Sequence, residues 1–598
     1  MISTLLVANR GEIAARIIRT ARDLGIRSVA VYAAQDVDSP AVRLADEAYA
    51  LPGSSIAETY LNADAIIDIA RRAGADAIHP GYGFLSEIPS FARAVVDAGL
   101  IWVGPRAETI EALGDKIGAR RTAVAAGVDP VPGTNDPVSD MALVRAFAAE
   151  HGFPIVLKRS DGGGGHGIVI IRSRADIDEF AARHDMPGGD LGAYFIERFI
   201  ESARHIETQC MADSHGNFAV VTTRDCSVQR RNQKLIEEAP APFLPEGVED
   251  TVAAWSKALF SHTGYVGLGT CEFLLDEDGS VYFLEVNPRL QVEHTVSEEV
   301  TGLDLVEEQL RIASGEALAE VPAARGHSIE LRITCEDPGA DLAPTAGVIT
   351  DLFWPSGPGV RLDTGVGPGN RISPDFDSMI AKLIITGPTR PRAIARALRA
   401  LGELHIEGIA TPAPLLAKIL HDPDFAEDFK VGTRWLETQV LPGTDFAPFE
   451  AAEQVAQERP SRTFTAEIDG RRHTITVPAD LFGSVSSARP VQPRRSSGRK
   501  ESAAPGADGV VVRDGVLVSP MQAIVVRIAV EEGQQVAEGD ILLVLESMKM
   551  EKYVHASSAG TIAEIMVDPG QNVPANTPLM KINMTNDVTN DVTNEEDR

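Results

Sequence analysis

The C-terminal part of the chain contains an internal repeat, and this repeat restricts the possible folds more than any other feature. Residues 523–545 and 560–582 share one order of apolar runs, and each carries the turn sequence Gly-Gln-x-Val at the matching place. The spacing predicts two strand–turn–strand units of an all-β domain. Lys549 lies between the two halves, flanked by Met548 and Met550. We therefore expect this lysine at the tip of a hairpin.

This segment resembles the biotinyl (biotin carboxyl carrier) domains, which are flattened β-barrels with a covalently biotinylated lysine at a hairpin tip. Those domains usually read Ala-Met-Lys-Met, and Ser547 replaces the alanine here. A lipoyl-type domain or a merely exposed lysine is the alternative, although lipoyl hairpins usually carry Asp-Lys-Ala. The resemblance implies that biotin is bound covalently to Lys549 and that a biotin protein ligase attaches it.

Length and composition limit the remaining possibilities. A chain of 598 residues should form several domains, because single hydrophobic cores stop growing near ~250–300 residues. The formal net charge of −31 argues against a nucleic-acid partner. The four cysteines lack the spacing of a zinc site or a disulfide framework. No apolar run is long enough for a membrane span and the N-terminus lacks a basic signal region, so we expect a cytoplasmic protein.

Residues 1–111 alternate between strand-like and helix-like patterns. Thr4–Ala8 reads as a buried strand, a helix with one apolar face starts at Glu12, and Arg27–Ala33 reads as the next strand. This order predicts an α/β domain with a parallel sheet. The Gly- and Pro-rich segment His79–Glu87 follows a third strand, at the edge where such sheets usually bind ligands. A purely structural turn is the alternative.

A glycine-rich loop in the next region has the composition of a phosphate-binding site. Only His166 interrupts its five glycines, which lie between the strand-like runs 155–158 and 168–172: Gly162, Gly163, Gly164, Gly165 and Gly167. Backbone N–H groups of such a loop can surround a polyphosphate without side-chain clashes. The loop lacks the Walker pattern, and a flexible surface turn is the alternative. Lys116 and Lys158 could supply positive charge.

A predicted hairpin carries two carboxylates on one face. The turn Asp276–Gly279 separates its strands. With residue 275 opposite residue 280, Glu272 faces Phe283 and lies diagonal to Glu285, and diagonal neighbours are ~7–8 Å apart. Such a pair of hard oxygen ligands suits Mg²⁺ shared with the phosphates of a nucleotide. Two half-exposed strand glutamates are the alternative.

The rest of the chain contains one charged strand and several short or irregular segments. Arg332 lies inside the strand-like run 328–333, where its charge points either into a cleft or into an ion-paired core. Residues 462–477 form a small β-like piece with a turn at Asp469-Gly470. Residues 484–509 are rich in Ser, Pro, Arg and Gly, which predicts a mobile linker. The tail 584–598 predicts disorder.

Residues 1–440 closely resemble a biotin carboxylase of the ATP-grasp superfamily. The matching stretches occur in order: Ala8–Glu12, His79–Glu87, Arg224–Lys234, Glu237–Pro242, Glu285–Asn287, Arg289–His294 and Asp377–Leu383. Together with the biotinyl segment, the chain looks like the biotin-containing α subunit of a bacterial acyl-CoA carboxylase, most similar to actinobacterial ones. The resemblance implies ATP- and bicarbonate-dependent carboxylation of biotin for onward transfer to an acyl-CoA.

The resemblance also implies a domain plan: an α/β N-terminal domain, an α+β ATP-grasp domain, a mixed C-terminal carboxylase domain, and an all-β flattened barrel on a flexible linker. The expected bounds are 1–111, 112–320 and 321–440 for the carboxylase, 441–483 for a small docking segment, 484–509 for the linker, 510–583 for the biotinyl domain and 584–598 for the tail. No carboxyltransferase fits in the residues that remain. We therefore expect a separate carboxyltransferase β subunit, and a homodimeric carboxylase core within a larger hetero-oligomer.

The site residues that the resemblance implies fall into four groups. ATP would be bound by Lys116, Lys158, the 162–167 loop, Glu197, Ile200, His205 and Gln229. Mg²⁺, or Mn²⁺ in its place, would be bound by Glu272, Glu285 and Asn287. Bicarbonate would be bound by the catalytic groups Lys234 and Arg289 with Gln291 and the Val292 backbone, and Glu293 would be the base that deprotonates it. Tyr82 would line the biotin pocket, and Arg332 would stabilise the biotin enolate.

Some positions depart from the family's usual pattern. His166 replaces an Arg or Lys, Ile168 a Met, Asn232 a His or Tyr, and Pro288 a Thr or Ser, and the lid segment near 185–191 is short. Two other functions stay open, namely an ATP-grasp ligase for another acceptor such as urea, and a biotin carrier scaffold without catalysis. Urea-dependent turnover without a β subunit would favour the first, and absence of nucleotide binding would favour the second.

Overall fold

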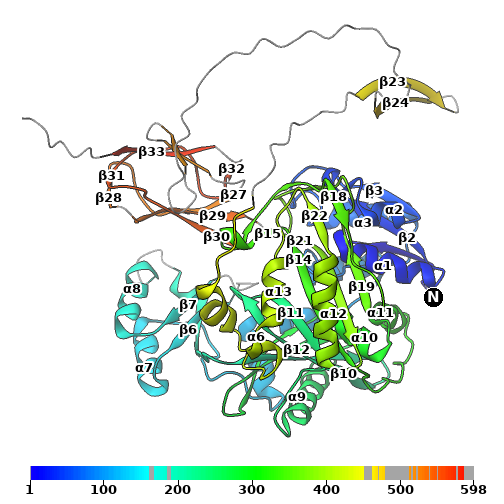
Figure 1. Ribbon diagram of the computed structural model, residues 1–598. Helices are drawn as coiled ribbons and strands as arrows, with labels where there is room; N and C mark the ends of the chain where they lie inside the picture. The colour runs from blue at the N-terminus through cyan, green and yellow to red at the C-terminus, as the bar shows by residue number, and fades with distance from the viewer. Residues whose placement is uncertain are drawn as a thin grey trace, which may run out of the picture. The chain divides into compact units, whose positions relative to one another are not determined.

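The computed structural model describes most of the chain. The described residues are 2–160, 167–184, 190–449, 461–468, 471–478, 511–513, 516–519, 523–537, 539–547, 550–573 and 577–584. The chain divides into two compact units, one built on residues 1–449 and one on the chain that follows (Figure 1). Several predictions lie outside the described residues: the loop glycines Gly162, Gly163, Gly164 and Gly165 with His166, the linker 484–509, Lys549, and the tail from residue 585 onward.

The N-terminal α/β prediction is confirmed. Five strands form a parallel sheet in the order β3-β2-β1-β4-β5, with bounds β1 Thr4–Val7, β2 Arg27–Tyr32, β3 Glu47–Ala50, β4 Ala77–His79 and β5 Ile101–Trp102. Helices α1 (Gly11–Asp23), α3 (Ala63–Ala73) and α4 (Pro89–Asp97) connect them and bury their apolar faces. The segment after β4 lies at the carboxyl end of the sheet, as expected for a ligand-binding edge.

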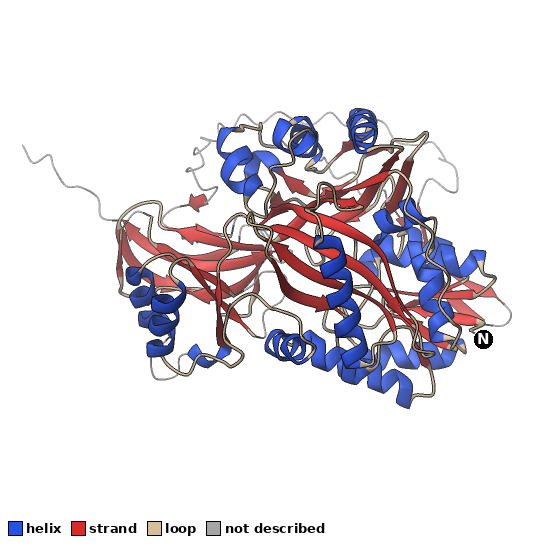
Figure 2. Ribbon diagram, turned by 90° about the horizontal axis from the view of Figure 1, so that it is seen from below, coloured by secondary structure: helices blue, strands red, loops and turns tan. Residues whose placement is uncertain are grey.

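An eight-stranded sheet forms the centre of the first unit (Figure 2). Its order is β13-β12-β9-β10-β11-β14-β21-β19, with bounds β9 Arg204–Ala212, β10 Phe218–Arg230, β11 Gln233–Ala239, β12 Gly267–Leu275, β13 Val281–Asn287, β14 His327–Thr334, β19 Val360–Thr364 and β21 Met379–Gly387. All neighbouring strands are antiparallel. The sheet therefore joins strands from both sides of the expected boundary at residue 320 into one layer.

Alternation along the central strands separates an apolar face from a charged face. In β14, Ile329, Leu331 and Ile333 pack in one core with Ala393 and Ile394 of helix α12 (Arg390–Glu403). The side chains between them point to the opposite face, because neighbouring residues of a strand alternate. There Glu330 accepts a hydrogen bond from Thr295 Oγ1 of helix α10 (His294–Thr301). This second face of the sheet, covered by α10, carries the charged residues of the site.

A smaller sheet flanks the predicted glycine loop. Its order is β7-β6-β8, with bounds β6 Ile155–Arg159, β7 Ile168–Ile171 and β8 Tyr194–Arg198. β6 and β7 are antiparallel neighbours, with Lys158 opposite Ile168 at the end that leads into the loop. Helices α7 (Met141–His151) and α8 (Arg174–His184) belong to the same part of the chain. The two predicted strands on either side of the glycine run are thus present.

The predicted register of the β12–β13 hairpin is wrong by one residue near the turn, where Leu275 is paired with Val281, and by two residues at Glu272. Phe273 is paired with Phe283, but Glu272 is paired with Glu285, so Leu284 is an extra residue that forms a β-bulge. Glu272 does not face Phe283, as the sequence reasoning assumed. The shift near the turn and the bulge together convert the expected diagonal relationship of the two glutamates into a direct cross-strand pair, whose side chains share one face of the sheet.

In the second unit, the internal repeat folds with matching pairings. The first half supplies β27 (Ala523–Ile528), β28 (Gln535–Val536) and β29 (Ile541–Ser547), and the second half supplies β31 (Gly560–Ile565), β32 (Asn572–Val573) and β33 (Pro578–Met584). β27 pairs with β29 and with the other half's β32, while β31 pairs with β33 and with the other half's β28. Each half thus completes the sheet of the other. The predicted all-β domain is confirmed.

Strand β30 (Met550–His555) continues the chain directly after the Met-Lys-Met sequence and belongs to the same sheet as β29. The buried apolar residues of both halves form one core, among them Leu543, Leu545, Val554 and Ile582. The small β-like piece is also confirmed, as an antiparallel pair of β23 (Ser461–Ile468) and β24 (Arg471–Pro478). Within the described residues, no helix has the length and apolar character needed to cross a membrane.

Candidate active site

The carboxylate of Glu293 lies at the start of α10 between two cations from neighbouring strands. Its Oε1 accepts a hydrogen bond from Lys234 Nζ of β11, and its Oε2 accepts one from Arg332 Nη2 of β14 at 3.0 Å. Glu293 is buried, and burial alone would raise its pKa. The charges of Lys234, Arg332 and Arg224 outweigh burial and hold the pKa well below its ordinary value. Glu293 is therefore ionised and anchored at both oxygens.

Lys234 connects this carboxylate to two others. Its Nζ also donates to Glu207 Oε2 at 2.7 Å and to Glu272 Oε1 at 3.2 Å. Burial opposes its charge, but Glu207, Glu272 and Glu293 together raise its pKa well above the ordinary value. One ammonium group thus joins the predicted base to the predicted metal-binding strand.

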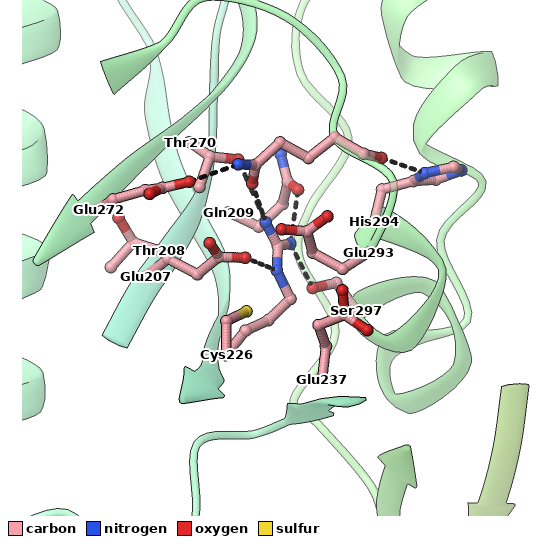
Figure 3. A network of polar contacts seen from close by, with 12 residues as sticks. Glu207, Thr208, Gln209, Cys226, Glu237, Thr270, Glu272, Glu293, His294 and Ser297 are labelled. Atoms are coloured by element: carbon pink, nitrogen blue, oxygen red, sulfur yellow. Dashed lines mark hydrogen bonds and ion pairs between the residues drawn. The ribbon is translucent and has the colours of Figure 1, made fainter. Parts of the chain in front are cut away.

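Beneath these groups, Arg224 of β10 is fully buried and donates to five acceptors. Nε binds Glu207 Oε1, and the Nη atoms bind Gln209, Ser297, Thr270 and Gln291. Among the side chains labelled in Figure 3, Glu207 and Gln209 of β9, Thr270 of β12 and Ser297 of α10 surround this centre. Because every acceptor is itself on a buried strand, helix or turn, Arg224 fixes the relative positions of the elements that carry the site.

Glu272 and Glu285 form the part of the site that suits a divalent cation. Burial and the negative charge of Glu272 raise the pKa of Glu285 above its ordinary value. The pKa of Glu272 is held low despite burial, because Lys234 and His205 stabilise its charge. A divalent cation between these two facing carboxylates would remove their repulsion and replace the water that burial excludes. The oxygen donors of this pair therefore fit Mg²⁺.

The other residues predicted to surround the metal and nucleotide meet in the same network. His205 Nε2 lies 2.8 Å from Glu272 Oε2, and its Nδ1 is 2.7 Å from Gln229 Nε2. Asn287 donates through Nδ2 to Glu272 Oε1 at 2.7 Å, and its Oδ1 accepts from Arg289 Nη2 at 2.8 Å. His205, which we predicted to lie near the adenosine together with Gln229, thus contacts the predicted metal ligand Glu272, and Gln229 contacts His205.

Three of the four predicted bicarbonate residues, Arg289, Gln291 and Val292, lie between β13 and α10, and the fourth, Lys234, is on β11. Gln291 donates to Glu272 Oε1 at 2.7 Å, and Arg289 Nε lies 3.3 Å from Glu87 Oε2 of the loop after β4. The Val292 carbonyl accepts a hydrogen bond from Lys382 Nζ at 2.5 Å. Of the Val292 backbone, the N–H is therefore the group suited to an anion.

The predicted nucleotide residues form a second group. Lys158 Nζ of β6 lies 2.5 Å from Glu197 Oε2 of β8, and Arg120 of α6 (Lys116–Ala125) binds Glu197 Oε1. Ile200 is buried beside them with Val131. Lys116 is the first residue of α6, and its charge acts on the Glu285 carboxyl group. Lys158 thus lies on the strand that leads into the glycine loop, and Lys116 lies near the predicted metal ligand Glu285.

Tyr82 lies next to the ion pairs of Arg332. Its hydroxyl donates to Glu12 Oε1 of α1, and burial followed by the charge of Glu12 raises its pKa well above the ordinary value. Arg332 binds Glu237 Oε1 through Nε at 2.5 Å. The sequence left Arg332 either in a cleft or in an ion-paired core, and the structure shows a half-buried arginine in contact with two glutamate side chains, Glu237 and Glu293.

Sequence reasoning assigned no role to Glu207, Glu237 or Lys382. A sequence pattern could have identified Glu207. It lies between His205 and Gln209 in β9, and residues at every second position of a strand share one face. Glu237 and Lys382 fall inside matching stretches, but only the pairing of β11, β14 and β21 shows what they contact.

The comparisons with known proteins agree with this arrangement. Residues 1–110 match the biotin carboxylase N-terminal domain, residues 115–321 the ATP-binding domain of the carbamoyl-phosphate synthase L chain, residues 330–438 the biotin carboxylase C-terminal domain, and residues 515–582 the biotin-requiring enzyme family. The α3 subunit of a biotin-dependent acyl-coenzyme A carboxylase from Mycobacterium leprae is 46% identical over 97% of this chain and 98% of its own length.

Two solved structures are also similar. The biotin carboxylase domain dimer of Hydrogenobacter thermophilus 2-oxoglutarate carboxylase, in complex with MgADP, ADP and bicarbonate, is 41% identical, with a TM-score of 0.69 over 73% of this chain and 97% of that one. A single-chain, multi-domain long-chain acyl-CoA carboxylase is 36% identical, with a TM-score of 0.64 over 98% of this chain and 51% of that one.

The fold and the site define an ATP-dependent biotin carboxylase joined to a biotin carrier domain. It uses ATP, Mg²⁺ and covalently bound biotin. The chain belongs to the family of biotin-dependent acyl-coenzyme A carboxylase α subunits.

Proposed function

We propose that Glu293 is the base of the carboxylation reaction and that biotin is attached to Lys549. The observation that carries the first assignment is the position of the Glu293 carboxylate between Lys234 and Arg332. Glu293 also follows Gln291 by two residues and Arg289 by four in the chain. Bicarbonate would bind to Lys234, Arg289, Gln291 and the Val292 N–H. An anion placed there would compete with Glu293 for Lys234, and Glu293 would then become basic enough to take the bicarbonate proton.

The deprotonated bicarbonate oxygen would attack the γ-phosphorus of ATP. The bond between the γ-phosphorus and the β–γ bridging oxygen would break, and ADP would leave with carboxyphosphate as the other product. Lys116 and Lys158 would bind the phosphates, and Lys234 and Arg289 would neutralise the developing charge. Mg²⁺ held by Glu272 and Glu285, with Asn287 beside them, would supply further charge neutralisation at the phosphates.

Carboxyphosphate would then break at its C–O bond to give CO₂ and phosphate. Biotin, when bound, would supply a ureido nitrogen whose proton passes to the released phosphate and which then binds CO₂ for transfer to the β subunit. Arg332 would stabilise negative charge on the ureido oxygen, and Tyr82, held by Glu12, would line the pocket. Glu237, which binds Arg332 Nε, would keep the guanidinium in place.

The partners follow from the relatives. We propose a carboxyltransferase β subunit that accepts the carboxyl group on an acyl-CoA, because the α3 subunit of the M. leprae relative is named as one part of such a carboxylase. A homodimer of the carboxylase part is supported by the dimer in the H. thermophilus structure. A biotin protein ligase would modify Lys549. The domain bounds given above are retained as part of this proposal.

Phosphate release from ATP by the full chain tests the assignment of Glu293. We expect release that requires bicarbonate, rises with free biotin, and falls at least about 100-fold in Glu293→Gln, since general bases contribute about 10²–10⁴-fold. The matched control is Glu299→Gln, on the same helix six residues later, where the carboxylate contacts Arg361 and Thr386. Bicarbonate-dependent release that persists in Glu293→Gln would refute the assignment.

A further inference from the structure

Lys382 is a buried lysine in a strand that is otherwise apolar at its centre. β21 reads Met-Ile-Ala-Lys-Leu-Ile-Ile-Thr-Gly, and the residues from Ile380 to Ile385 are all buried. Its side chain is 1% exposed. An ammonium group at such a position costs free energy unless it makes specific contacts, and an apolar side chain would pack there at lower cost. The contacts of Lys382 should therefore explain its presence.

The closest polar contact of Lys382 is with the active-site turn. Its Nζ donates to the Val292 carbonyl at 2.5 Å, whereas the Glu330 Oε2 atom lies 3.8 Å away. Asp363, opposite Lys382 on β19, is already paired with Arg361 at 3.0 Å. The carbonyl, and not a carboxylate, is thus the partner at hydrogen-bonding distance.

Lys382 lies directly across from Arg332 in the register of β14 and β21. Cross-strand partners point to the same face, so both cations face α10. Arg332 binds the side chain of Glu293 at 3.0 Å, and Lys382 binds the backbone of Val292, the residue before it. Two adjacent strands therefore hold two consecutive residues of the site, one by its carboxylate and one by its carbonyl.

Of the two carbonyl groups before Glu293, one is bound by a residue near it in the chain and the other by the sheet. His294 Nδ1 lies 2.7 Å from the Gln291 carbonyl, so the first carbonyl of the turn is bound from within the turn. The next carbonyl, that of Val292, is bound by Lys382. Because a trans peptide is planar, fixing this carbonyl also fixes the N–H and the Cα of Glu293, the atom from which the side chain of the base extends.

We infer that Lys382 is a positioning residue, which holds the Val292 carbonyl and so keeps the base Glu293, together with Val292, whose own N–H would bind the anion, in place for bicarbonate. This inference rests on the proposed function, and it gives a role to the matching stretch Asp377–Leu383. Without Lys382 the peptide can rotate. Bicarbonate binding and the chemical step then weaken together, while the nucleotide residues, which lie on other strands, keep their geometry.

The test uses the full chain with Lys382→Met, which keeps the length of the side chain but cannot donate. We expect the KM for bicarbonate to rise about tenfold or more and kcat to fall by a similar factor, with ADP affinity within about twofold of wild type. Lys382→Gln can still donate and should recover bicarbonate KM to within about threefold. Lys418→Met, at an exposed position of α13 (Ala413–His421), is the matched control.

A further variant separates positioning from a structural ion pair. Glu330→Gln removes the carboxylate near Lys382 without changing its shape, and we expect bicarbonate KM to stay within about threefold of wild type. The inference is overturned if Glu330→Gln reproduces the Lys382→Met defect, if Lys382→Met has wild-type bicarbonate KM, or if it loses ADP binding in parallel. Lack of bicarbonate-dependent phosphate release by the wild-type chain would instead refute the proposed function.

Discussion

Glu272 and Glu285 are direct cross-strand partners, because the bulge at Leu284 brings them to the same position on β12 and β13. Burial, and then repulsion by the Glu272 carboxylate, raises the pKa of Glu285 above its ordinary value. A metal ion that binds both carboxylates would relieve this repulsion, which favours its binding.

The first prediction concerns this pair. Glu285→Gln should raise the Mg²⁺ concentration for half-maximal ATP cleavage by roughly 10–100-fold, the size of effect that disturbed metal sites usually show. Titration of free Mg²⁺ at saturating ATP measures it. Glu277→Gln, in the exposed turn of the same hairpin, should leave the Mg²⁺ dependence unchanged. Equal Mg²⁺ dependence in Glu285→Gln and wild type would exclude Glu285 as a ligand.

The same pair shows what sequence could predict and what it could not. Two glutamates in adjacent apolar strands across a short turn are visible in the sequence, and their shared face was predicted correctly. The bulge was not visible, because an extra residue in one strand leaves the alternation on either side intact. The internal repeat was more informative, since its two halves had to pair in the same way.

The sequence did not reveal the roles of Arg224, Glu237 and Lys382, because their contacts join residues that are far apart in the chain. Arg224 binds residues that are 15 to 73 positions away in the chain, and Lys382 reaches Val292 across 90 positions. No local pattern encodes such contacts, which depend on strand order. The strand order β11-β14-β21 brings Glu237, Arg332 and Lys382 together, and it follows from the fold as a whole.

The second prediction is a pH dependence of stability that involves Glu237. Burial raises the pKa of this carboxyl group to about 8, although Arg332 acts against the shift. The unfolded chain releases the proton near the ordinary value of 4.5, while the folded chain keeps it until about 8. The stability that the neutral group contributes is complete below 4.5 and is lost as the pH rises toward 8.

Glu237→Gln cannot titrate and mimics the neutral form. Its Tm relative to wild type should therefore rise between pH 5 and pH 8.5, as measured by calorimetry of the carboxylase transition. Glu246→Gln, at an exposed position, should show no such trend. A Tm difference that is constant with pH would mean that Glu237 is ionised throughout this range.

The third prediction concerns Asn232, one of the departures from the family pattern. Arg231 and Asn232 have φ values of 49° and 63° and form the two-residue loop between β10 and β11. Two left-handed residues are typical of a type I′ hairpin, and Asn adopts this conformation more readily than most residues. The loop leads directly into the strand that carries Lys234, so Asn232 is suited to its position for a conformational reason.

Asn232→Val should destabilise the carboxylase part by about 1–2 kcal/mol, because a β-branched side chain disfavours positive φ. Asn232→Gly should be close to wild type, and urea denaturation followed by fluorescence compares the two. Equal stability of the valine and glycine variants would show that the loop does not impose this conformation in solution.

The last prediction separates the carrier from the carboxylase. Lys549→Arg keeps the positive charge but removes the amine that forms the amide bond to biotin, so the variant should not bind streptavidin after expression with a biotin protein ligase. It should also lose acyl-CoA carboxylation with the β subunit. ATP cleavage stimulated by free biotin should remain at the wild-type rate, because the residues of that site lie within 1–449. Lys552→Arg, at a nearby lysine in β30, should behave as wild type in all three assays. If Lys549→Arg still bound streptavidin, another residue would carry the biotin and the assignment of Lys549 would be wrong.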